Sequence, residues 1–202
     1  MRRFSSRSLL ATASAAVAAV LLIAGGLLLW GSAYVHNTVQ GQLAAQQISF
    51  PPAAAFAHRK AGTEITPSMI PSVSQYAGQQ LLTGQQAEAY ADHFIAVHIA
   101  NMAGGKTYSQ LSAEAIAQPS NTQLAGLVNT VFKGETLRSM LLNAYGWWKI
   151  SQITYIISLA AFGLGAVAGL GSIFLFVTGR RNKSDAPMPP AGHETISPVT
   201  TA

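Results

Sequence analysis

Two histidines in the middle of the chain are the first residues whose type and spacing suggest chemistry. Two histidines hold a metal ion from one helix when they are three or four residues apart, because both rings then lie on one face. His93 and His98 are five residues apart, which is about 140° around a helix, so their rings diverge. A metal site would need further ligands, such as His36 or His58, brought in by the fold. The simpler interpretation is a hydrogen-bonded His98 on an apolar stripe, and we predict no metal site.

Carboxylates occur in the same segment. Glu88 and Asp92 are four residues apart and would face one another on a helix. Paired carboxylates can divide acid and base roles when their environments differ. Neither a partner base nor an aromatic sugar platform accompanies this pair, so we interpret it as part of a charged helix face. Glu135 and Arg138, three residues apart, predict either a local ion pair or contacts to a partner protein.

The remaining motifs do not support catalysis. Gly104-Gly105-Lys106-Thr107 is similar to the end of a phosphate-binding loop, but it lacks the upstream glycine and the preceding strand. The serines have no Gly-x-Ser-x-Gly setting. The absence of cysteine excludes thiolate catalysis, disulfides, cysteine-ligated zinc and iron–sulfur clusters. We therefore predict a protein that is not an enzyme, with no catalytic residue and no cofactor.

Two long apolar runs without charged residues determine the class of the protein. They comprise residues 9–30 and 150–178, and each is long enough to span a bilayer, which takes about 20 helical residues. We predict an all-α membrane protein with two transmembrane helices flanking an exported α-helical domain. Its predicted parts are a cytoplasmic N-terminus (1–8), a first transmembrane helix (9–30), an extracytoplasmic helical domain (31–149), a second transmembrane helix (150–178) and a disordered cytoplasmic tail (179–202).

Basic residues beside the two runs predict the orientation. Positive side chains near span ends are retained in the cytoplasm, so both termini are expected on the cytoplasmic side of the plasma membrane. These residues are Arg2, Arg3, Arg7, Arg180, Arg181 and Lys183. They are half of the 12 lysine and arginine residues of the chain, whose net charge is +5. We therefore expect contact with the membrane and no binding of nucleic acid.

A cleaved signal peptide is the alternative for the first run. Gly31-Ser32-Ala33 offers small residues for cleavage. However, the run is longer than the roughly 7–15 apolar residues of a signal-peptide core, which favours an uncleaved anchor. Trp30 after the first span, and Trp147 and Trp148 before the second, are then predicted to be anchors in the headgroup layer.

Small residues predict how the spans pack. Ala11, Ala15 and Ala19 form a ridge on the first span, and Gly165 and Gly169 form a Gly-xxx-Gly motif on the second. Such surfaces allow close approach of helix backbones inside lipid. We expect the two spans to pack on each other first, and on another subunit, including a second copy of the chain, second.

Helix signals organise the exported segment. Apolar residues spaced by four predict that the first helix continues to about residue 47 and ends at Phe50-Pro51-Pro52. Residues 53–75 are expected to be irregular, and no sheet is predicted. Further helices are expected as follows: one capped by Thr83 and Gln86 and stopped at Gly104-Gly105, one capped by Ser112 and ending before Pro119, one capped by Asn121, and a last one from near Glu135 into the second span.

Several strings resemble a family of two-span membrane proteins from actinobacteria, of unknown function. They are GQLAAQQISFPP (residues 41–52), AYADHFI (89–95), GGKTYS (104–109), and GETLR (134–138) followed by LLNAY (141–145). The resemblance covers roughly residues 30–150. It implies two spans and an exported helical domain, and it attaches no activity and no catalytic residue to the chain.

Three functional hypotheses follow, in order of preference. The first is a non-catalytic accessory or scaffolding subunit whose exported domain binds other membrane or envelope proteins. The second is a domain that binds a small molecule, lipid or metal in a helical pocket around His98, Tyr90 and Phe132. The third is an exported enzyme. The residues predicted to contact a partner or line a pocket are Tyr90, Asp92, His98, Glu135 and Arg138.

Overall fold

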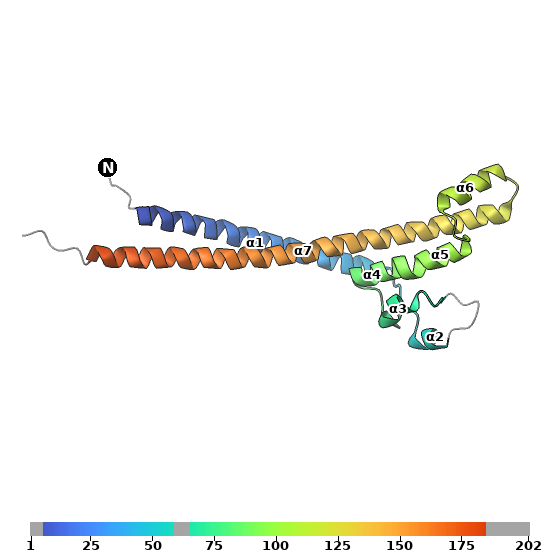
Figure 1. The fold of residues 1–202 in the computed structure, drawn as a ribbon, viewed down its shortest axis with the longest axis horizontal. Helices are drawn as coiled ribbons and strands as arrows, with labels where there is room; N and C mark the ends of the chain where they lie inside the picture. Colours follow the sequence, from blue (N-terminus) through green and yellow to red (C-terminus); the bar gives the residue numbers. More distant parts are fainter. Residues whose placement is uncertain (1–5, 59–64, 185–202) are drawn as a thin grey trace, which may run out of the picture. The chain divides into compact units, whose positions relative to one another are not determined.

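The computed structural model describes residues 6–58 and 65–184, and in this part of the chain the architecture is α-helical (Figure 1). The elements are α1 (Ser6–Ala45), α2 (Ala53–Ala57), α3 (Ile70–Val73), η1 (Ser74–Tyr76), α4 (Gly84–Tyr90), η2 (Ala91–Ile95), α5 (Ala96–Met102), α6 (Tyr108–Ala117) and α7 (Thr122–Ser184). The chain divides into two compact units, one made of Met1–Ala24 with Ala161–Ala202 and the other of Gly25–Ala160.

Within residues 6–58 and 65–184, two helices are long and apolar enough to cross a membrane. They are α1 and the part of α7 from Thr122 to Gly179. The predicted all-α class with two candidate spans is therefore confirmed at this coarse level. The predicted tail falls mostly outside the described residues, but α7 continues through its first residues to Ser184. The basic residues Arg2 and Arg3 also lie outside the described part.

In the first unit, α1 and α7 pack through small side chains. Ser172 Oγ donates a 2.8 Å hydrogen bond to the carbonyl oxygen of Ala11. A Cβ built on Gly169 would lie 3.8 Å from the Cβ of Ala18, and one on Gly165 would lie 3.1 Å from the Cγ of Leu22. These close approaches explain why glycine and serine occupy the second helix here.

The contact surface of α1 in this unit differs from the predicted ridge. Ala11 and Ala18, seven residues apart, are buried, whereas Ala15 and Ala19 are exposed. A four-residue spacing drifts around a straight helix, but a seven-residue spacing stays on the seam of two helices that wind around each other. The packing surface is therefore defined by Ala11 and Ala18 on α1 and by Gly165 and Gly169 on α7.

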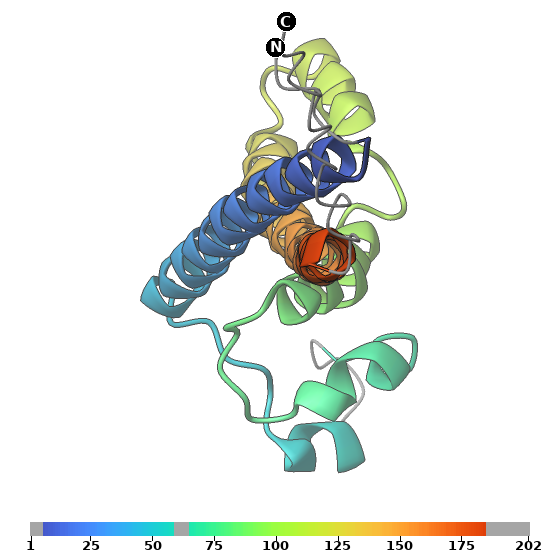
Figure 2. The same cartoon turned by 90° about the vertical axis from the view of Figure 1, so that its left-hand side faces the viewer.

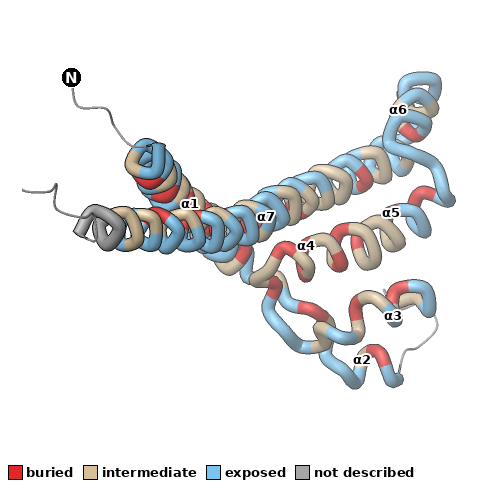
Figure 3. The backbone as a smooth tube through the Cα atoms, turned by 60° about the vertical axis from the view of Figure 1, so that its left-hand side comes forward, coloured by how far each residue is buried: buried red, intermediate tan, exposed pale blue. Residues whose placement is uncertain are grey.

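In the second unit, α4, η2 and α5 lie between α7 and the small helices α2 and α3 (Figures 1 and 2). Buried positions recur along α3 and α4, and the apolar core is assembled from every helix of this unit (Figure 3). Its fully buried side chains include Met69, Val73, Leu81 and Val131. The core therefore unites segments that are far apart in the sequence.

Local signals explain where α4 begins and where α5 ends. Thr83 Oγ1 accepts a hydrogen bond from the backbone N–H of Gln86, and Gln86 Oε1 accepts one from the N–H of Thr83. This is the predicted capping box. Gly104 and Gly105 have positive φ values of 60° and 77°, and the Gly105 N–H donates to the carbonyl of Ala100. The predicted glycine stop is thus confirmed.

The middle of this helical segment differs from a regular α-helix. Residues Ala91–Ile95 form one π-helical turn between α4 and α5. The extra residue in this turn rotates all later side chains relative to the earlier ones. The apolar pattern of the segment predicted a single uninterrupted helix and gave no sign of the turn.

Two other boundaries correct the sequence-based expectation. Helix α6 begins after Thr107, whose Oγ1 caps it with Gln110 as the reciprocal partner, so Ser112 is not its cap. Asn121 does cap the next helix, through Oδ1 and the N–H of Leu124. That helix does not stop near residue 133, because α7 runs without a break from Thr122.

The connection after α1 is also more ordered than predicted. Helix α1 ends at Ala45, and Gln47 adopts a positive φ of 53°, so the turn precedes Pro51 and Pro52. The chain then pairs briefly with a later segment, since the Phe50 N–H donates to the Gln79 carbonyl and the Leu81 N–H donates to the Ile48 carbonyl. Short helices α2 and α3 occupy the range expected to be irregular. In residues 6–58 and 65–184 this pairing leaves an isolated bridge and no strand.

Candidate functional site

An ion-pair cluster joins the π-turn to α7. Arg138 donates from Nη2 and Nε to Asp92 Oδ1, at 2.8 Å and 3.1 Å. It also donates from Nη1 to Glu135 Oε2 at 3.4 Å, as the three-residue spacing predicted. The π-turn sets the rotation of Asp92, and Arg138 and Glu135 lie one turn apart on α7. Three of the predicted contact residues are thus brought together.

The electrostatics of this cluster favour a structural tie. The hydrogen bond to Asp92 raises the pKa of Arg138, with further contributions from the negative charges of Asp92 and Glu135, while burial opposes the rise. Arg138 therefore remains a cation and cannot exchange protons as an acid–base catalyst does. Its side chain and that of Asp92 are each about one third exposed (33% and 34%), so solvent screening limits the contribution of this pair to below about 1 kcal/mol.

The other predicted pocket residues do not share neighbours. The Tyr90 ring packs against Phe50 and Phe94, with ring centroids 5.3 Å and 4.8 Å away. The Phe132 ring instead contacts Tyr108 at 5.5 Å. His98 is partly buried on α5. Within residues 6–58 and 65–184, no group of three or more histidine, aspartate or glutamate side chains is placed to hold a metal ion.

The predicted interface tryptophans have different environments. Trp30 stacks with Tyr34 and is 70% exposed, and Trp147 is 51% exposed. Trp148 is only 5% exposed. Its ring lies against that of His36, with centroids 3.9 Å apart. Trp148 is therefore a core residue of the second unit and not a lipid-facing anchor. Adjacent residues on a helix point about 100° apart, so Trp147 is exposed while Trp148 is buried.

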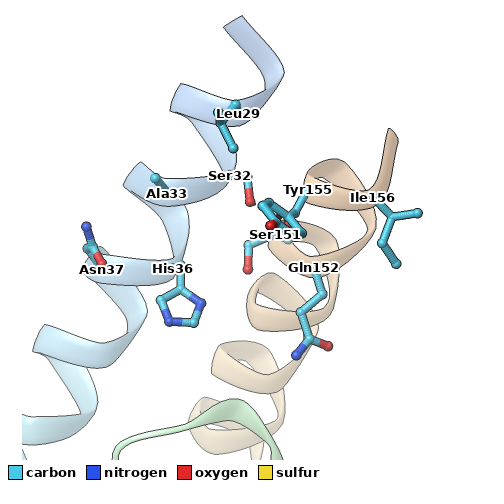
Figure 4. Close-up of a pocket in the computed structure, with 9 residues that line it drawn as sticks. All are labelled: Leu29, Ser32, Ala33, His36, Asn37, Ser151, Gln152, Tyr155 and Ile156. Carbon is cyan, nitrogen blue, oxygen red and sulfur yellow. Dashed lines mark hydrogen bonds between the residues drawn. The ribbon is translucent and has the colours of Figure 1, made fainter. Parts of the chain in front are cut away.

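A pocket of about 550 Å³ lies between α1 and α7 within the second unit (Figure 4). Ser32 and Ser151 face each other at its back, where Ser32 Oγ donates a 2.7 Å hydrogen bond to the Ser151 carbonyl. Ser151 Oγ in turn donates to the Trp148 carbonyl. The nine lining residues are Leu29, Ser32, Ala33, His36, Asn37, Ser151, Gln152, Tyr155 and Ile156.

Sequence reasoning missed this pocket. The sequence suggests a role for His36 only as a further metal ligand, and it predicts no pocket on this part of the first helix. The signal that indicates the pairing is the seven-residue spacing of small residues on each helix. Ser151 and Ser158 are buried on α7, and Gly25 and Ser32 on α1. Small residues at this spacing bring two helices close together, and larger neighbours then frame a space between them.

Comparisons with known proteins add no assignment. No protein-family model, no curated protein and no solved structure matches the chain. The resemblance to two-span actinobacterial membrane proteins therefore remains a prediction.

Proposed function

We propose that this chain is a non-catalytic plasma-membrane protein, an accessory or scaffolding subunit whose extracytoplasmic helical domain binds another membrane or envelope protein. The two candidate spans and the basic residues predicted to flank them support a membrane location with both termini in the cytoplasm. The partner-binding surface belongs to the Gly25–Ala160 unit.

An exposed apolar stripe on α7 is the observation that carries this proposal. Phe132, Met140 and Trp147 are 52%, 65% and 51% exposed. Their spacings of eight and seven residues place them within about 80° of one another on the helix surface. An apolar helix face of this kind is the usual docking surface for a partner helix or groove. We name these three residues the outer stripe.

The predicted charged contacts fit this interpretation as supports for the surface. The ion pair between Asp92 and Arg138 ties the π-turn to α7. In the sequence, Arg138 lies near the middle of the outer stripe. Glu135 is partly exposed beside them. Charges at the rim of an interface tune encounter and register more than they add affinity.

Co-purification in gentle detergent tests the proposal. The full-length tagged protein is isolated from its native membranes, and the proteins that accompany it are quantified by mass spectrometry. We expect a defined set of membrane or envelope proteins in fixed ratio. Met140→Asp should remove that set by placing a charge on the outer stripe. Ile116→Asp is the matched control, since Ile116 is 80% exposed on α6 and outside the stripe.

Two results would overturn the proposal. The first is a wild-type protein that carries no defined set of other proteins. The second is a Met140→Asp variant that retains the wild-type set, or an Ile116→Asp variant that loses it to the same extent.

A further inference from the structure

We infer that the pocket between α1 and α7 is a lipid site that takes a lipid with an uncharged, hydroxyl-rich headgroup, a class represented by glycolipids. This inference rests on the proposed membrane topology. It concerns the residues that line the pocket in the second unit and is independent of the outer stripe.

The lining residues change from apolar to polar along the pocket. Leu29 and Ile156 lie at one end, and His36 and Gln152 lie at the other, about two turns along α1 and one turn along α7 (Figure 4). On the proposed topology the apolar end faces the hydrocarbon layer and the polar end faces the outside. Trp30, next to Leu29 and 70% exposed, marks the boundary between the hydrocarbon layer and the headgroups at the apolar end of the pocket. This gradient matches an acyl chain joined to a polar headgroup.

The polar groups of the pocket select the type of headgroup. No lysine, arginine or carboxylate lines the pocket among the described residues. A phosphate headgroup offers acceptors only and is usually bound by arginine or lysine. The amide of Gln152, the imidazole of His36 and the hydroxyl of Tyr155 combine donors with acceptors. That combination matches hydroxyl groups, each of which both donates and accepts. Asn37 adds a second amide at the margin of the pocket.

The back wall leaves these groups available. The Ser32 hydroxyl already donates to the Ser151 carbonyl, and the Ser151 hydroxyl donates to the Trp148 carbonyl. The small side chains of Ser32 and Ala33 keep the wall open. A volume of about 550 Å³ lies within the range of pockets that bind small ligands, and it accommodates a headgroup with the first part of a chain.

Photolabelling in lipid nanodiscs tests the inference. The probe is a diglucosyl diacylglycerol with a diazirine in its acyl chain, added to phosphatidylcholine nanodiscs that contain the full-length protein. We expect peptides covering residues 29–37 and 151–156 to carry most of the label. Unlabelled diglucosyl diacylglycerol should compete, whereas phosphatidylglycerol should not.

Variants identify the site within these helices. Gln152→Leu should lower site-specific labelling about tenfold, as expected when one or two hydrogen bonds to the headgroup are lost. Ala33→Trp should abolish it by filling the pocket. Asn143→Leu is the matched control, because it makes a similar change on an exposed position of α7 and should leave labelling unchanged.

The outcomes separate this inference from the proposed function. Label spread evenly over both spans, equal competition by phosphatidylglycerol, or wild-type labelling of Ala33→Trp would each overturn the lipid site. None of these results changes which proteins co-purify with the chain. Conversely, Met140→Asp can lose its partners while the pocket is labelled normally. A protein that is extracted from membranes by alkaline carbonate would overturn the topology on which both depend.

Discussion

Gly84 is constrained by a single neighbour across the second unit. A Cβ at this position would lie 2.3 Å from the Cβ of Trp148 and 2.4 Å from its Cγ, which is closer than real Cβ atoms approach. The Trp148 ring also packs against the ring of His36, which limits how far Trp148 can move. The first residue of α4 is therefore glycine because α4 packs directly on the Trp148 side chain of α7. Most residues are accepted at the first position of a helix, but here only glycine is small enough.

Replacement of this glycine should be costly. Gly84→Ala is expected to destabilise the protein by about 1–3 kcal/mol, because overpacking forces Trp148 or α4 to move. Gly126→Ala, at a helical position with no atom within 4 Å of the added Cβ, should be neutral or stabilise by about 0.5–1 kcal/mol through helix propensity. Thermal unfolding of both full-length variants in the same detergent measures the difference. Equal melting temperatures would contradict the close packing of α4 on Trp148.

The Arg138 ion pair gives a second prediction at the scale of single residues. A double-mutant cycle with Asp92→Asn and Arg138→Gln should give a coupling energy of about 0.2–1 kcal/mol, since both side chains are one third exposed. Because the pKa of Arg138 is raised in the folded protein, the contribution of Arg138 to stability can only decrease as the pH rises. Its contribution is fully present below the unfolded pKa and declines only as the pH rises through the higher folded pKa.

Urea unfolding at neutral pH and at increasing alkaline pH measures this coupling. Because the pKa of arginine is already high, the contribution of Arg138 should stay constant through neutral and mildly alkaline conditions. A coupling energy that falls between neutral and mildly alkaline pH would show that another group controls the pair.

At the scale of elements, local signals were more predictable than contacts between segments. The capping box of Thr83 and Gln86 and the glycine stop at residues 104–105 depend on a few adjacent residues, so sequence alone located them. The π-turn at Ala91–Ile95 carries Asp92, which pairs with Arg138 on α7, and adjacent residues give no sign of a contact so distant in the sequence. Thr107 and Ser112 both fit a cap, and the reciprocal Gln110 selects Thr107.

Helix α7 shows the same limit at greater length. The sequence predicts a new helix from near Glu135, but Gly134 lies inside α7, where a Cβ would be 2.6 Å from Ile99 Cδ1. Its smallness serves contact with α5, which the sequence of α7 alone does not reveal. The pocket between α1 and α7 was missed for the same reason, since its lining comes from residues more than a hundred positions apart.

The seven-residue pattern of small residues yields a prediction for the paired helices. Ser158 is fully buried, with 0% exposure, and its hydroxyl donates within its own helix to the Tyr155 carbonyl. Ser158→Leu should therefore separate α7 from the helix it contacts and destabilise the protein by about 1–3 kcal/mol. Gly163→Leu is the control, because nothing lies within 4 Å of a Cβ there. Thermal unfolding in detergent should show a clear loss for Ser158→Leu alone. Equal loss in both would indicate that size, and not position on the seam, decides the effect.

At the scale of the whole molecule, two long helices contain the candidate spans and also contribute to the core of the second unit. Helix α1 contributes Val39 and Leu43 to the core of the second unit, and α7 contributes Val131, Leu141 and Trp148. The same two elements thus supply membrane-compatible segments and the surfaces on which the small helices fold.

The orientation of this framework can be measured directly, because the chain has no cysteine of its own. Asn129→Cys places a thiol at an exposed position of α7 in the proposed extracytoplasmic domain, and Ser197→Cys places one in the tail predicted to be cytoplasmic. In intact cells, a membrane-impermeant maleimide should label the first variant and reach the second only after the membrane is permeabilised. The positive residues that flank the spans are the physical reason, since they resist translocation. Labelling of Ser197→Cys in intact cells together with protection of Asn129→Cys would reverse the orientation. It would move the outer stripe to the cytoplasmic side, and the search for a partner would move with it.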